Sequence, residues 1–363
     1  MKVGIILGTR PEIIKIAPVI FELERNKISY FVIHTGQHYS ENMDKIFWDS
    51  LSISYPKFLL AIREKTHARQ TAEMLKQIDE ILENEIPNWV LVQGDTNSTL
   101  AGALAASKRK GIKLAHLEAG LRSFDRSMPE EINRIIVDHI SDLLLAPTRE
   151  SIDHLIAEGI PSERAVEVGN TIEDMLLQYL PRALTESKII ELLNLESKKF
   201  LLLTIHRQEN TEDLLRLRNI LETIFISAKK FNLDIVFPIH PRTRDIINKM
   251  NLSIPSNLHL IDPVGYFDFV NLQKNAKVIA TDSGGVQEES CILGVPCVTL
   301  RENTERPETI RLGANVLAGV TPKLIHAAIE MQLNKTLEKA WESPYGRGTA
   351  APKVVTMLIN NLK

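Results

Sequence analysis

Residues 3–12 read VGIILGTRPE, an apolar strand that turns at Gly8 into a helix with Pro11 in its first turn. Residues 277–286 read KVIATDSGGV and repeat the order of strand, turn and helix in the other half of the chain. Such turns aim backbone N–H groups and the positive end of a helix dipole at an anion. They predict a parallel α/β fold with two phosphate-binding loops, although either loop alone is equally well explained as a glycine turn.

Both loops carry groups that suit a diphosphate. Arg10 and Lys15 add two cations to the first loop. In the second loop Ser283 precedes the pair Gly284 and Gly285, which lets backbone amides approach a ligand closely. Because the loops lie in opposite halves of the chain, we predict a ligand held between two domains.

Apolar segments alternate with helical ones along the whole chain, which is typical of parallel sheets with helices on both faces. The predicted strands are Val3–Leu7, Tyr30–His34, Trp89–Gln93, Lys113–Leu117, Leu143–Ala146, Ala165–Val168, Phe200–Thr204, Asp234–Phe237, Leu258–Ile261, Lys277–Thr281 and Pro296–Thr299. We therefore predict an α/β protein with two Rossmann-like, doubly wound domains that face a cleft. They span residues 1–170 and 171–346, and a C-terminal segment covers 347–363.

The composition is that of a globular protein of 363 residues, with 44% apolar and 25% charged residues. The net charge of −3 gives no support for general binding to nucleic acid or to a membrane surface. No apolar run is long enough to cross a bilayer. Cys291 and Cys297 do not resemble a disulfide framework or a zinc ligand set. These features predict a reduced, cytoplasmic protein.

Three acids of the first half are candidates for proton transfer: Asp95, Glu118 and Glu130. Clustered acids push their pKa values apart, which gives a site both an acid and a base near neutral pH. Each has a structural alternative. Asp95 suits a helix cap, Glu130 lies at capping-box spacing from Ser127, and Glu118 has Arg122 as an ion-pair partner.

Polar residues also follow the strands of the second half. His206 and Arg207 follow one strand, and His240 follows the next. His206 suits a donor to a phosphate leaving group, although a loop histidine is more often a polar surface group. Glu289 lies one helical turn after Gly285, where its carboxylate suits two ribose hydroxyls. The alternative is that Glu288 or Glu289 belongs to a solvated helix face.

The sequence lacks a G-x-x-x-x-G-K nucleotide loop and an H-E-x-x-H zinc helix. Residues 346–351 read GRGTAA and loosely match a dinucleotide glycine pattern, but no βαβ unit follows them. We therefore expect no cofactor and no metal.

Five motifs together resemble the non-hydrolysing UDP-N-acetylglucosamine 2-epimerases. They are GTRPEIIK (8–15), QGDT (93–96), HLEAGLR (116–122), PEEINR (129–134) and TDSGGVQEE (281–289), and they occur in family order over essentially the whole chain. The resemblance implies two Rossmann-like domains similar to the B-type glycosyltransferases, with a C-terminal helix that returns to the first domain. It also implies a homodimer, no added cofactor, and UDP-N-acetylmannosamine as the product, used for surface polysaccharides.

The resemblance also implies roles for the candidate residues. Asp95, Glu118 and Glu130 serve the two faces of the sugar, without an assignment of which acid serves which face. UDP leaves to give a 2-acetamidoglucal and then adds back, because no carbonyl acidifies the C2 proton. The residues that hold the nucleotide or the sugar are Arg10, Lys15, Arg134, His206, Arg207, His240, Ser283, Gly284, Gly285 and Glu289. A second substrate molecule acts as an activator in some members, through positions that match Gln37, His38, Arg69, Arg207 and His240.

The motifs leave other functions open. A hydrolysing 2-epimerase that releases N-acetylmannosamine needs the same clamp and acids, and so does an epimerase of a UDP-2,3-diacetamido-hexuronate. A glycosyltransferase needs an acceptor groove and fewer acids around the sugar. A nucleotide-sugar sensor would keep Arg10, Ser283 and Glu289 but has no need of Asp95 and Glu118, so an enzyme is favoured.

Overall fold

The computed structural model describes residues 1–37, 48–49, 51–239, 241–250, 252–335 and 341–362. The chain divides into two compact units. Unit 1 contains Met1–Met175 and Pro344–Lys363, and unit 2 contains Leu176–Ser343. The first division falls inside a helix that begins at Thr171, whereas the sequence places a domain boundary at the start of that helix.

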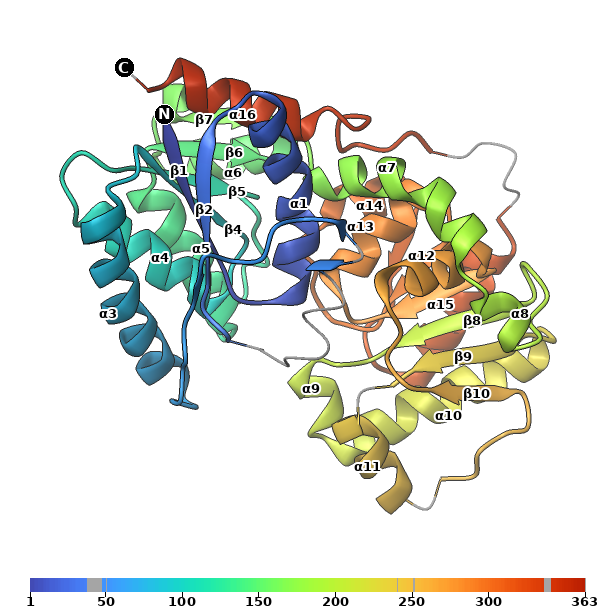
Figure 1. The fold of residues 1–363 in the computed structure, drawn as a ribbon. Helices are drawn as coiled ribbons and strands as arrows, with labels where there is room; N and C mark the ends of the chain where they lie inside the picture. Colours follow the sequence, from blue (N-terminus) through green and yellow to red (C-terminus); the bar gives the residue numbers. More distant parts are fainter. Residues whose placement is uncertain (38–47, 50, 240, 251, 336–340, 363) are drawn as a thin grey trace. The chain divides into compact units, whose positions relative to one another are not determined.

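Unit 1 is built on a seven-stranded parallel sheet with the order β3-β2-β1-β4-β5-β6-β7. Its strands are β1 (Lys2–Leu7), β2 (Ser29–His34), β3 (Phe58–Leu59), β4 (Trp89–Gln93), β5 (Lys113–Leu117), β6 (Leu143–Ala146) and β7 (Ala165–Glu167). Helices cover both faces (Figure 1), so the central strands are continuous buried apolar runs. The strand order reverses between β1 and β4, and the edge at their carboxyl ends is where such sheets bind ligands.

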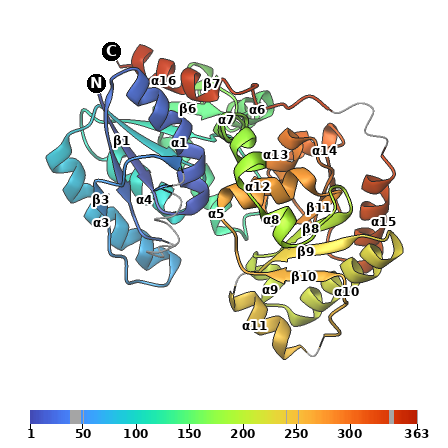
Figure 2. The ribbon, with the colours of Figure 1, turned by 45° about the vertical axis from the view of Figure 1, so that its right-hand side comes forward.

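The helices of unit 1 are α1 (Arg10–Arg25), α3 (His67–Glu85), α4 (Asn97–Ser107), α5 (Pro129–Ile140), α6 (Arg149–Ala157), the 3-10 turn η1 (Ser162–Arg164), the start of α7 (Thr171–Glu186) and α16 (Ala350–Asn360). Figures 1 and 2 both show α16 beside α1. The indole N–H of Trp89 donates to Leu358 O at 3.0 Å. Gly169 has φ +94°, and a Cβ there would lie 2.3 Å from Tyr345 O, so only glycine fits where the C-terminal segment rejoins unit 1.

Unit 2 contains a six-stranded parallel sheet with the order β10-β9-β8-β11-β12-β13. Its strands are β8 (Phe200–Thr204), β9 (Asp234–Pro238), β10 (Leu258–Ile261), β11 (Val278–Thr281), β12 (Cys297–Thr299) and β13 (Asn315–Leu317). Its helices are α8 (Ile189–Leu192), α9 (Gln208–Thr211), α10 (Leu214–Lys230), α11 (Pro241–Lys249), α12 (Tyr266–Asn275), α13 (Gly284–Leu293), α14 (Pro307–Arg311) and α15 (Pro322–Leu333). The order reverses between β8 and β11, as it does between β1 and β4 in unit 1.

The predicted fold class is confirmed. All predicted strands are present with small shifts at their ends, and two edge strands, β3 and β13, are additional. These two escaped prediction because each is defined by pairing with a neighbouring strand and not by an apolar run of its own. In the part of the chain that the structure describes, no helix combines the length and apolar character needed to cross a membrane.

Candidate active site

A buried carboxylate, Glu12, bridges the two loops at the switch point of unit 1. Its Oε2 accepts the Gly8 N–H at 3.0 Å and the Thr9 hydroxyl at 2.8 Å, and its Oε1 accepts the Thr96 hydroxyl at 2.9 Å. Burial raises the pKa of Glu12 to about 7. Gly8 has no room for a side chain, since a Cβ would lie 2.1 Å from Ser98 Oγ. The Gly8 N–H, expected to face a phosphate, therefore binds a carboxylate of the chain itself.

Glu118 follows β5 and is buried among polar partners. Its Oε1 forms an ion pair with Lys15 Nζ and accepts Asn170 Nδ2–H at 3.3 Å, while its Oε2 accepts from Gln93 Nε2. The backbone of Glu118 has φ +69°, a left-handed conformation that costs a non-glycine residue about 1–3 kcal/mol. The alternative pairing with Arg122 is wrong, because Arg122 binds other carboxylates.

Asp95 follows β4 and is held by a buried arginine. Arg134 Nη1 donates to Asp95 Oδ2 at 2.6 Å, and Asn133 Nδ2 donates to the Asp95 carbonyl at 2.8 Å. The Asp95 side chain remains 32% exposed, whereas that of Arg134 is 4% exposed. Asp95 is not a helix cap, because Thr96 caps α4 by accepting the Thr99 N–H at 3.2 Å. The carboxylate is thus oriented by a cation and open to solvent.

Asp95 and Glu118 lie at the same sheet edge because β4 and β5 are neighbouring parallel strands. The register pairs Gln93 with Leu117, the last residues of the two strands. A Cβ built on Gly94, the residue before Asp95, would lie 3.6 Å from Glu118 Oε2. The structure therefore brings two of the three predicted acids together at the carboxyl edge of the sheet.

Glu130 lies in the first turn of α5, and the capping-box interpretation is wrong. The helix begins at Pro129 with Met128 as N-cap and has no side-chain cap hydrogen bond. Ser127 Oγ donates instead to Asp125 at 2.6 Å. Glu130 is half-buried and lies four residues before Arg134, on the same face of the helix.

In unit 2 the buried carboxylate of Asp282 organises the loop that carries His206. It accepts the backbone N–H of His206 at 3.1 Å and of Arg207 at 3.0 Å, together with Asn210 Nδ2–H at 3.0 Å. Its Oδ1 also lies 2.9 Å from His206 Nδ1, and the histidine side chain is 54% exposed. Burial by itself raises the pKa of Asp282, but the hydrogen bonds and charge of His206 outweigh it and lower the pKa.

The N-terminus of α13 carries the predicted glycines and both glutamates. Gly284 opens the helix, and Ser283 N–H donates to Thr281 Oγ1 at 3.0 Å. Glu288 is fully buried and forms an ion pair with a buried arginine. Glu289 is 7% exposed, and its Oε2 accepts a hydrogen bond from Gln273 Nε2 of α12 at 2.7 Å. The solvated-face alternative is therefore wrong for both glutamates.

The residues assigned to an activator are spread over several elements. Gln37 Oε1 accepts the Ser98 N–H at 3.0 Å in the first turn of α4. Arg69 lies on α3 with a side chain that is 74% exposed and 3.9 Å from Glu64. Arg207 is the N-cap of α9. His38 and His240 lie outside the described residues.

Comparison with known proteins identifies the family. The model of the UDP-N-acetylglucosamine 2-epimerase family matches residues 22–359. The chain is 50% identical to a UDP-N-acetylglucosamine 2-epimerase of Methanocaldococcus jannaschii over 99% of both chains. A crystal structure of the M. jannaschii enzyme in complex with UDP-GlcNAc and UDP superimposes with a TM-score of 0.93, at 49% identity, over 99% of this chain and 100% of that one. The chain belongs to the UDP-N-acetylglucosamine 2-epimerase family.

Two more distant similarities define the limits of that assignment. The chain is 42% identical to a UDP-2,3-diacetamido-2,3-dideoxy-D-glucuronate 2-epimerase of Pseudomonas aeruginosa, over 99% of both chains. A glycosyltransferase of kitacinnamycin shares the fold with a TM-score of 0.60, at 11% identity and with coverage of 99% of this chain and 98% of that one. The resemblance to the epimerase family that the motifs indicate is therefore confirmed, together with its glycosyltransferase-like fold.

The candidate site also contains residues to which the sequence analysis assigned no role. Gln93 and Asn170 complete the surroundings of Glu118, and Asp282 organises the His206 loop. For a further acid, Asp138 on α5, spacing along the helix gives no signal, because its partners His116 and Arg122 lie on other segments. For Asn170 the sequence offers no signal, because its proximity to Glu118 arises only from the folded chain.

Two observations bear on cofactors in this family member. Within the described ranges, no three His, Cys, Asp or Glu side chains converge in an arrangement suited to a metal ion. The glycine-rich segment before α16 is occupied by the chain itself, because Asp174 accepts the N–H groups of Ala350 at 3.2 Å and Ala351 at 2.9 Å. A carboxylate thus takes the place where a dinucleotide phosphate would bind.

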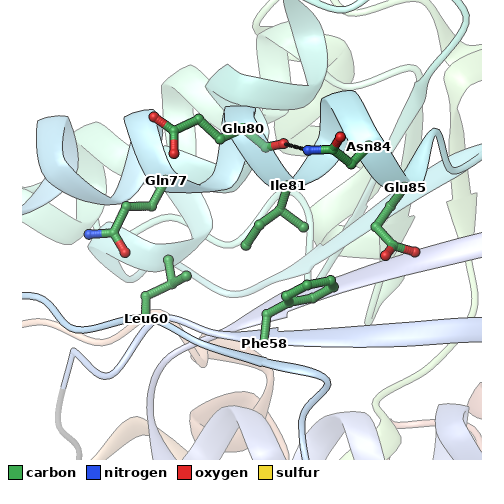
Figure 3. A pocket seen from close by; sticks show the side chains of 7 residues that line it. All are labelled: Phe58, Leu60, Gln77, Glu80, Ile81, Asn84 and Glu85. Atoms are coloured by element: carbon green, nitrogen blue, oxygen red, sulfur yellow. Dashed lines mark hydrogen bonds between the residues drawn. The ribbon is translucent and has the colours of Figure 1, made fainter.

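A surface pocket with a volume of about 290 Å³ lies between β3 and α3, apart from the acid cluster of the epimerase. Figure 3 shows Phe58 and Ile81 facing one another across it, with Glu80 and Glu85 at its rim. The described residues that line it include these two carboxylates and no cation. Glu85 is ion-paired with Lys2 at 2.7 Å and with Lys57 at 2.6 Å, and none of the predicted nucleotide-binding residues is among those that line the pocket.

Proposed function

We propose that the protein converts UDP-N-acetylglucosamine to UDP-N-acetylmannosamine without net hydrolysis. The observation that carries the proposal is the pair of carboxylates at adjacent strand ends, Asp95 and Glu118, each held by a buried cation. Side chains fixed in this way suit proton transfer at a bound sugar, because little reorganisation is needed at the moment of reaction. Family membership and the similarity to an enzyme that binds UDP-GlcNAc support the choice of substrate.

The reaction proceeds by elimination and re-addition. One carboxylate takes the C2 proton while the C1–O bond breaks, so that the electron pair leaves with UDP and a C1–C2 double bond forms. The UDP oxygen then attacks C1, and a carboxylic acid delivers a proton to the opposite face of C2. Atoms and charges balance without a cofactor or a metal. Glu130, in the first turn of α5, is the third candidate for this proton traffic.

Unit 2 supplies the groups that we assign to UDP. His206, oriented through Nδ1 by Asp282, serves the diphosphate together with the first turn of α13 at Ser283, Gly284 and Gly285. Glu289, oriented by a buried amide, serves the ribose hydroxyls. In unit 1 Arg10 opens α1 and is assigned to the diphosphate, and Arg207 and His240 of unit 2 are assigned to substrate binding without a specific contact. Lys15 balances the charge of Glu118 in addition to any phosphate contact.

The assembly and location of the protein are also proposed. A homodimer is proposed from the family resemblance, and the measurement is the mass in solution by light scattering. A cytoplasmic location is proposed because Cys291 and Cys297 are both buried thiols that do not take part in a disulfide. Binding of a second substrate molecule through Gln37, His38 and Arg69 is proposed as well. A hyperbolic rate curve without lag or sigmoidicity would contradict that activation.

Proton NMR in D₂O with UDP-N-acetylglucosamine, and without added metal or NAD, tests the function. We expect UDP-N-acetylmannosamine that carries deuterium at C2. Free N-acetylmannosamine with UDP would show that water traps the intermediate and that the enzyme hydrolyses its substrate.

A second substrate, UDP-2,3-diacetamido-2,3-dideoxy-D-glucuronate, is favoured by one observation, the 42% identity to the P. aeruginosa epimerase. The same NMR measurement with this nucleotide sugar decides between the two. Turnover of the diacetamido sugar at a higher kcat/KM than UDP-N-acetylglucosamine would replace the first proposal. Turnover of neither would leave a nucleotide-sugar sensor.

A further inference from the structure

A buried ion network lies behind both acid-bearing turns of unit 1. Asp138 on α5 has Oδ1 2.6 Å from His116 Nδ1 and Oδ2 2.7 Å from Arg122 Nη1, and all three side chains are fully buried. The same Oδ2 accepts the Gly120 N–H at 3.1 Å. On the other side of the imidazole, His116 Nε2 lies 2.8 Å from Gly94 O. The Asp138 carboxylate thus contacts the turn at Gly120 directly and the turn at Gly94 through the imidazole of His116.

The geometry determines which partner donates each hydrogen bond. The Gly94 carbonyl can only accept, so His116 Nε2 carries a proton. Burial by itself raises the pKa of Asp138, but the charges and hydrogen bonds of His116 and Arg122 outweigh it and lower the pKa. Asp138 is therefore ionised. The ring thus lies between the Gly94 carbonyl at Nε2 and the Asp138 carboxylate at Nδ1. Glu158 neutralises the other side of Arg122 at 2.7 Å and 2.8 Å.

The two turns that the network contacts carry the proposed catalytic acids, Asp95 and Glu118. Gly94 precedes Asp95, and Gly120 follows Glu118 after one intervening residue. Both glycines have left-handed φ angles, +73° at Gly94 and +80° at Gly120. Such turns leave a peptide carbonyl or N–H pointing away from the sheet, so a buried partner is needed to fix its direction. His116 fixes the Gly94 carbonyl, and Asp138 fixes the Gly120 N–H.

We propose that His116 and Asp138 are positioning residues that hold Asp95 and Glu118 in their reactive orientation. The inference rests on the proposed function, in which those two acids move the C2 proton. A displacement of about 1 Å at a reacting group costs roughly 100-fold in rate. The network therefore acts on kcat, while the groups that bind UDP lie elsewhere.

Asp138→Asn is the first test, with Glu158→Gln as a matched control. Both variants remove one negative charge beside Arg122, but Glu158 touches neither turn. We expect Asp138→Asn to lower kcat about 100-fold with KM changed by less than about threefold, and Glu158→Gln to keep kcat within about threefold. Equal losses of kcat in the two variants would overturn the inference, because the effect would then be one of general stability.

Substitutions of His116 provide a second test that holds even if Asp138→Asn does not fold. Gln places its amide donor where Nε2 lies, toward Gly94 O, whereas Asn places it where Nδ1 lies, toward Asp138. Both variants replace the imidazole by a neutral amide. We expect His116→Gln to keep a kcat about tenfold higher than His116→Asn, because it still fixes the Gly94 carbonyl. Equal kcat values would overturn the inference.

The wild-type measurement separates failure of the inference from failure of the function. If the wild type turns over and the variants behave as their controls do, the positioning role alone is wrong. If the wild type does not act on either nucleotide sugar, the proposed function fails and this inference fails with it. Nitrogen-15 NMR of labelled histidine gives an independent readout. We expect Nε2 of His116 to carry a proton, because it faces the Gly94 carbonyl, and an Nε2 without a proton would overturn the network described.

Discussion

Each unit has a buried carboxylate at the switch point of its sheet, and the pKa values of the two carboxylates are shifted in opposite directions. In unit 1 the buried Glu12 bridges the loops after β1 and β4, and its partners are N–H and hydroxyl groups such as those of Gly8 and Thr96. In unit 2 the buried Asp282, after β11, accepts from the loop after β8, and one of its partners is the imidazole of His206. The pKa of Glu12 is raised to about 7, and that of Asp282 is lowered.

The difference shows that the charge of the partner, and not burial, decides how such a carboxylate behaves. The same contrast extends to the groups that we assign to catalysis. In unit 1 acids are held by buried cations, Glu118 by Lys15 and Asp95 by Arg134. In unit 2 a histidine is held by a buried anion. We therefore propose that the fold places proton-transfer acids at the switch point of unit 1 and donors to the nucleotide at that of unit 2.

The largest effect is expected from Glu118→Gln, which removes an acid of unit 1 while keeping its shape. We expect kcat to fall about 1000-fold, because general acid–base groups contribute about 10²–10⁴ in rate. The measurement is turnover of UDP-N-acetylglucosamine, together with hydrogen exchange at C2.

The control is Asp174→Asn, which removes a different carboxylate of unit 1 that binds the N–H groups of Ala350 and Ala351. It should lower the unfolding temperature and leave kcat within about threefold, because Asp174 contacts the start of α16 and not the acid cluster. If Glu118→Gln kept more than about a tenth of wild-type kcat, Glu118 would not be one of the proton-transfer groups.

Asp282→Asn is the corresponding test in unit 2. The amide keeps the size of the side chain but loses the charge that orients the His206 ring, so we expect kcat/KM to fall about 100-fold. Asp213→Asn is the control, because Asp213 caps α10 in the same unit and Asn caps helices equally well. A loss of less than about threefold would show that the His206 orientation does not matter for the reaction.

The stability of the Asp282→Asn variant has a defined pH dependence. Because the folded-state pKa of Asp282 is lowered, its contribution is present above the unfolded value of about 3.9 and is lost as the pH falls through the folded pKa. We therefore expect the variant to be less stable than the wild type at pH 7, with the difference shrinking below about pH 4. Unfolding temperatures at a series of pH values measure it, and a constant difference would contradict the ionised state.

Lys15→Met tests whether the buried cation of unit 1 is required for the fold of the acid cluster. Removing it leaves Glu118 buried beside a thioether, which we expect to cost about 3 kcal/mol, or roughly 6–12 °C in unfolding temperature. The double variant Lys15→Met with Glu118→Gln should regain part of this loss, since no uncompensated charge remains. If the double variant were less stable than Lys15→Met alone, the ion pair would not be the cause.

The fold was accessible from the sequence because its central strands are unbroken apolar runs followed by glycine turns. The sequence alone also placed Asp95 and Glu118 at one sheet edge. Each residue follows a predicted strand, and neighbouring parallel strands end at the same edge. The short strands β3 and β13 were not accessible. They are defined by pairing with a neighbour, not by their own composition.

The roles of several site residues could not be read from spacing because they depend on contacts between distant segments. Lys15 meets Glu118 from 103 residues away, and Asn170 meets it from 52 residues away. For Glu130 the local pattern gave a wrong prediction. Its spacing of three residues from Ser127 fits a capping box, but the helix begins at Pro129 and has no side-chain cap hydrogen bond. Asp138 lies four residues after Arg134 on α5, but it contacts Arg122 from another segment, while Arg134 contacts Asp95.

The smallest effect, on stability alone, is expected from Glu12→Gln. The folded-state pKa of about 7 lies above the unfolded value, so the carboxyl contributes stability that is present below about pH 4.5 and lost as the pH rises through 7. Relative to the wild type, the variant should therefore gain about 2.5 kcal/mol of unfolding free energy between pH 5 and pH 8. An exposed-site control, Glu163→Gln, should show no such gain. A flat difference for Glu12→Gln would mean that Glu12 is ionised in the folded protein as Asp282 is, and the contrast between the two switch points would disappear.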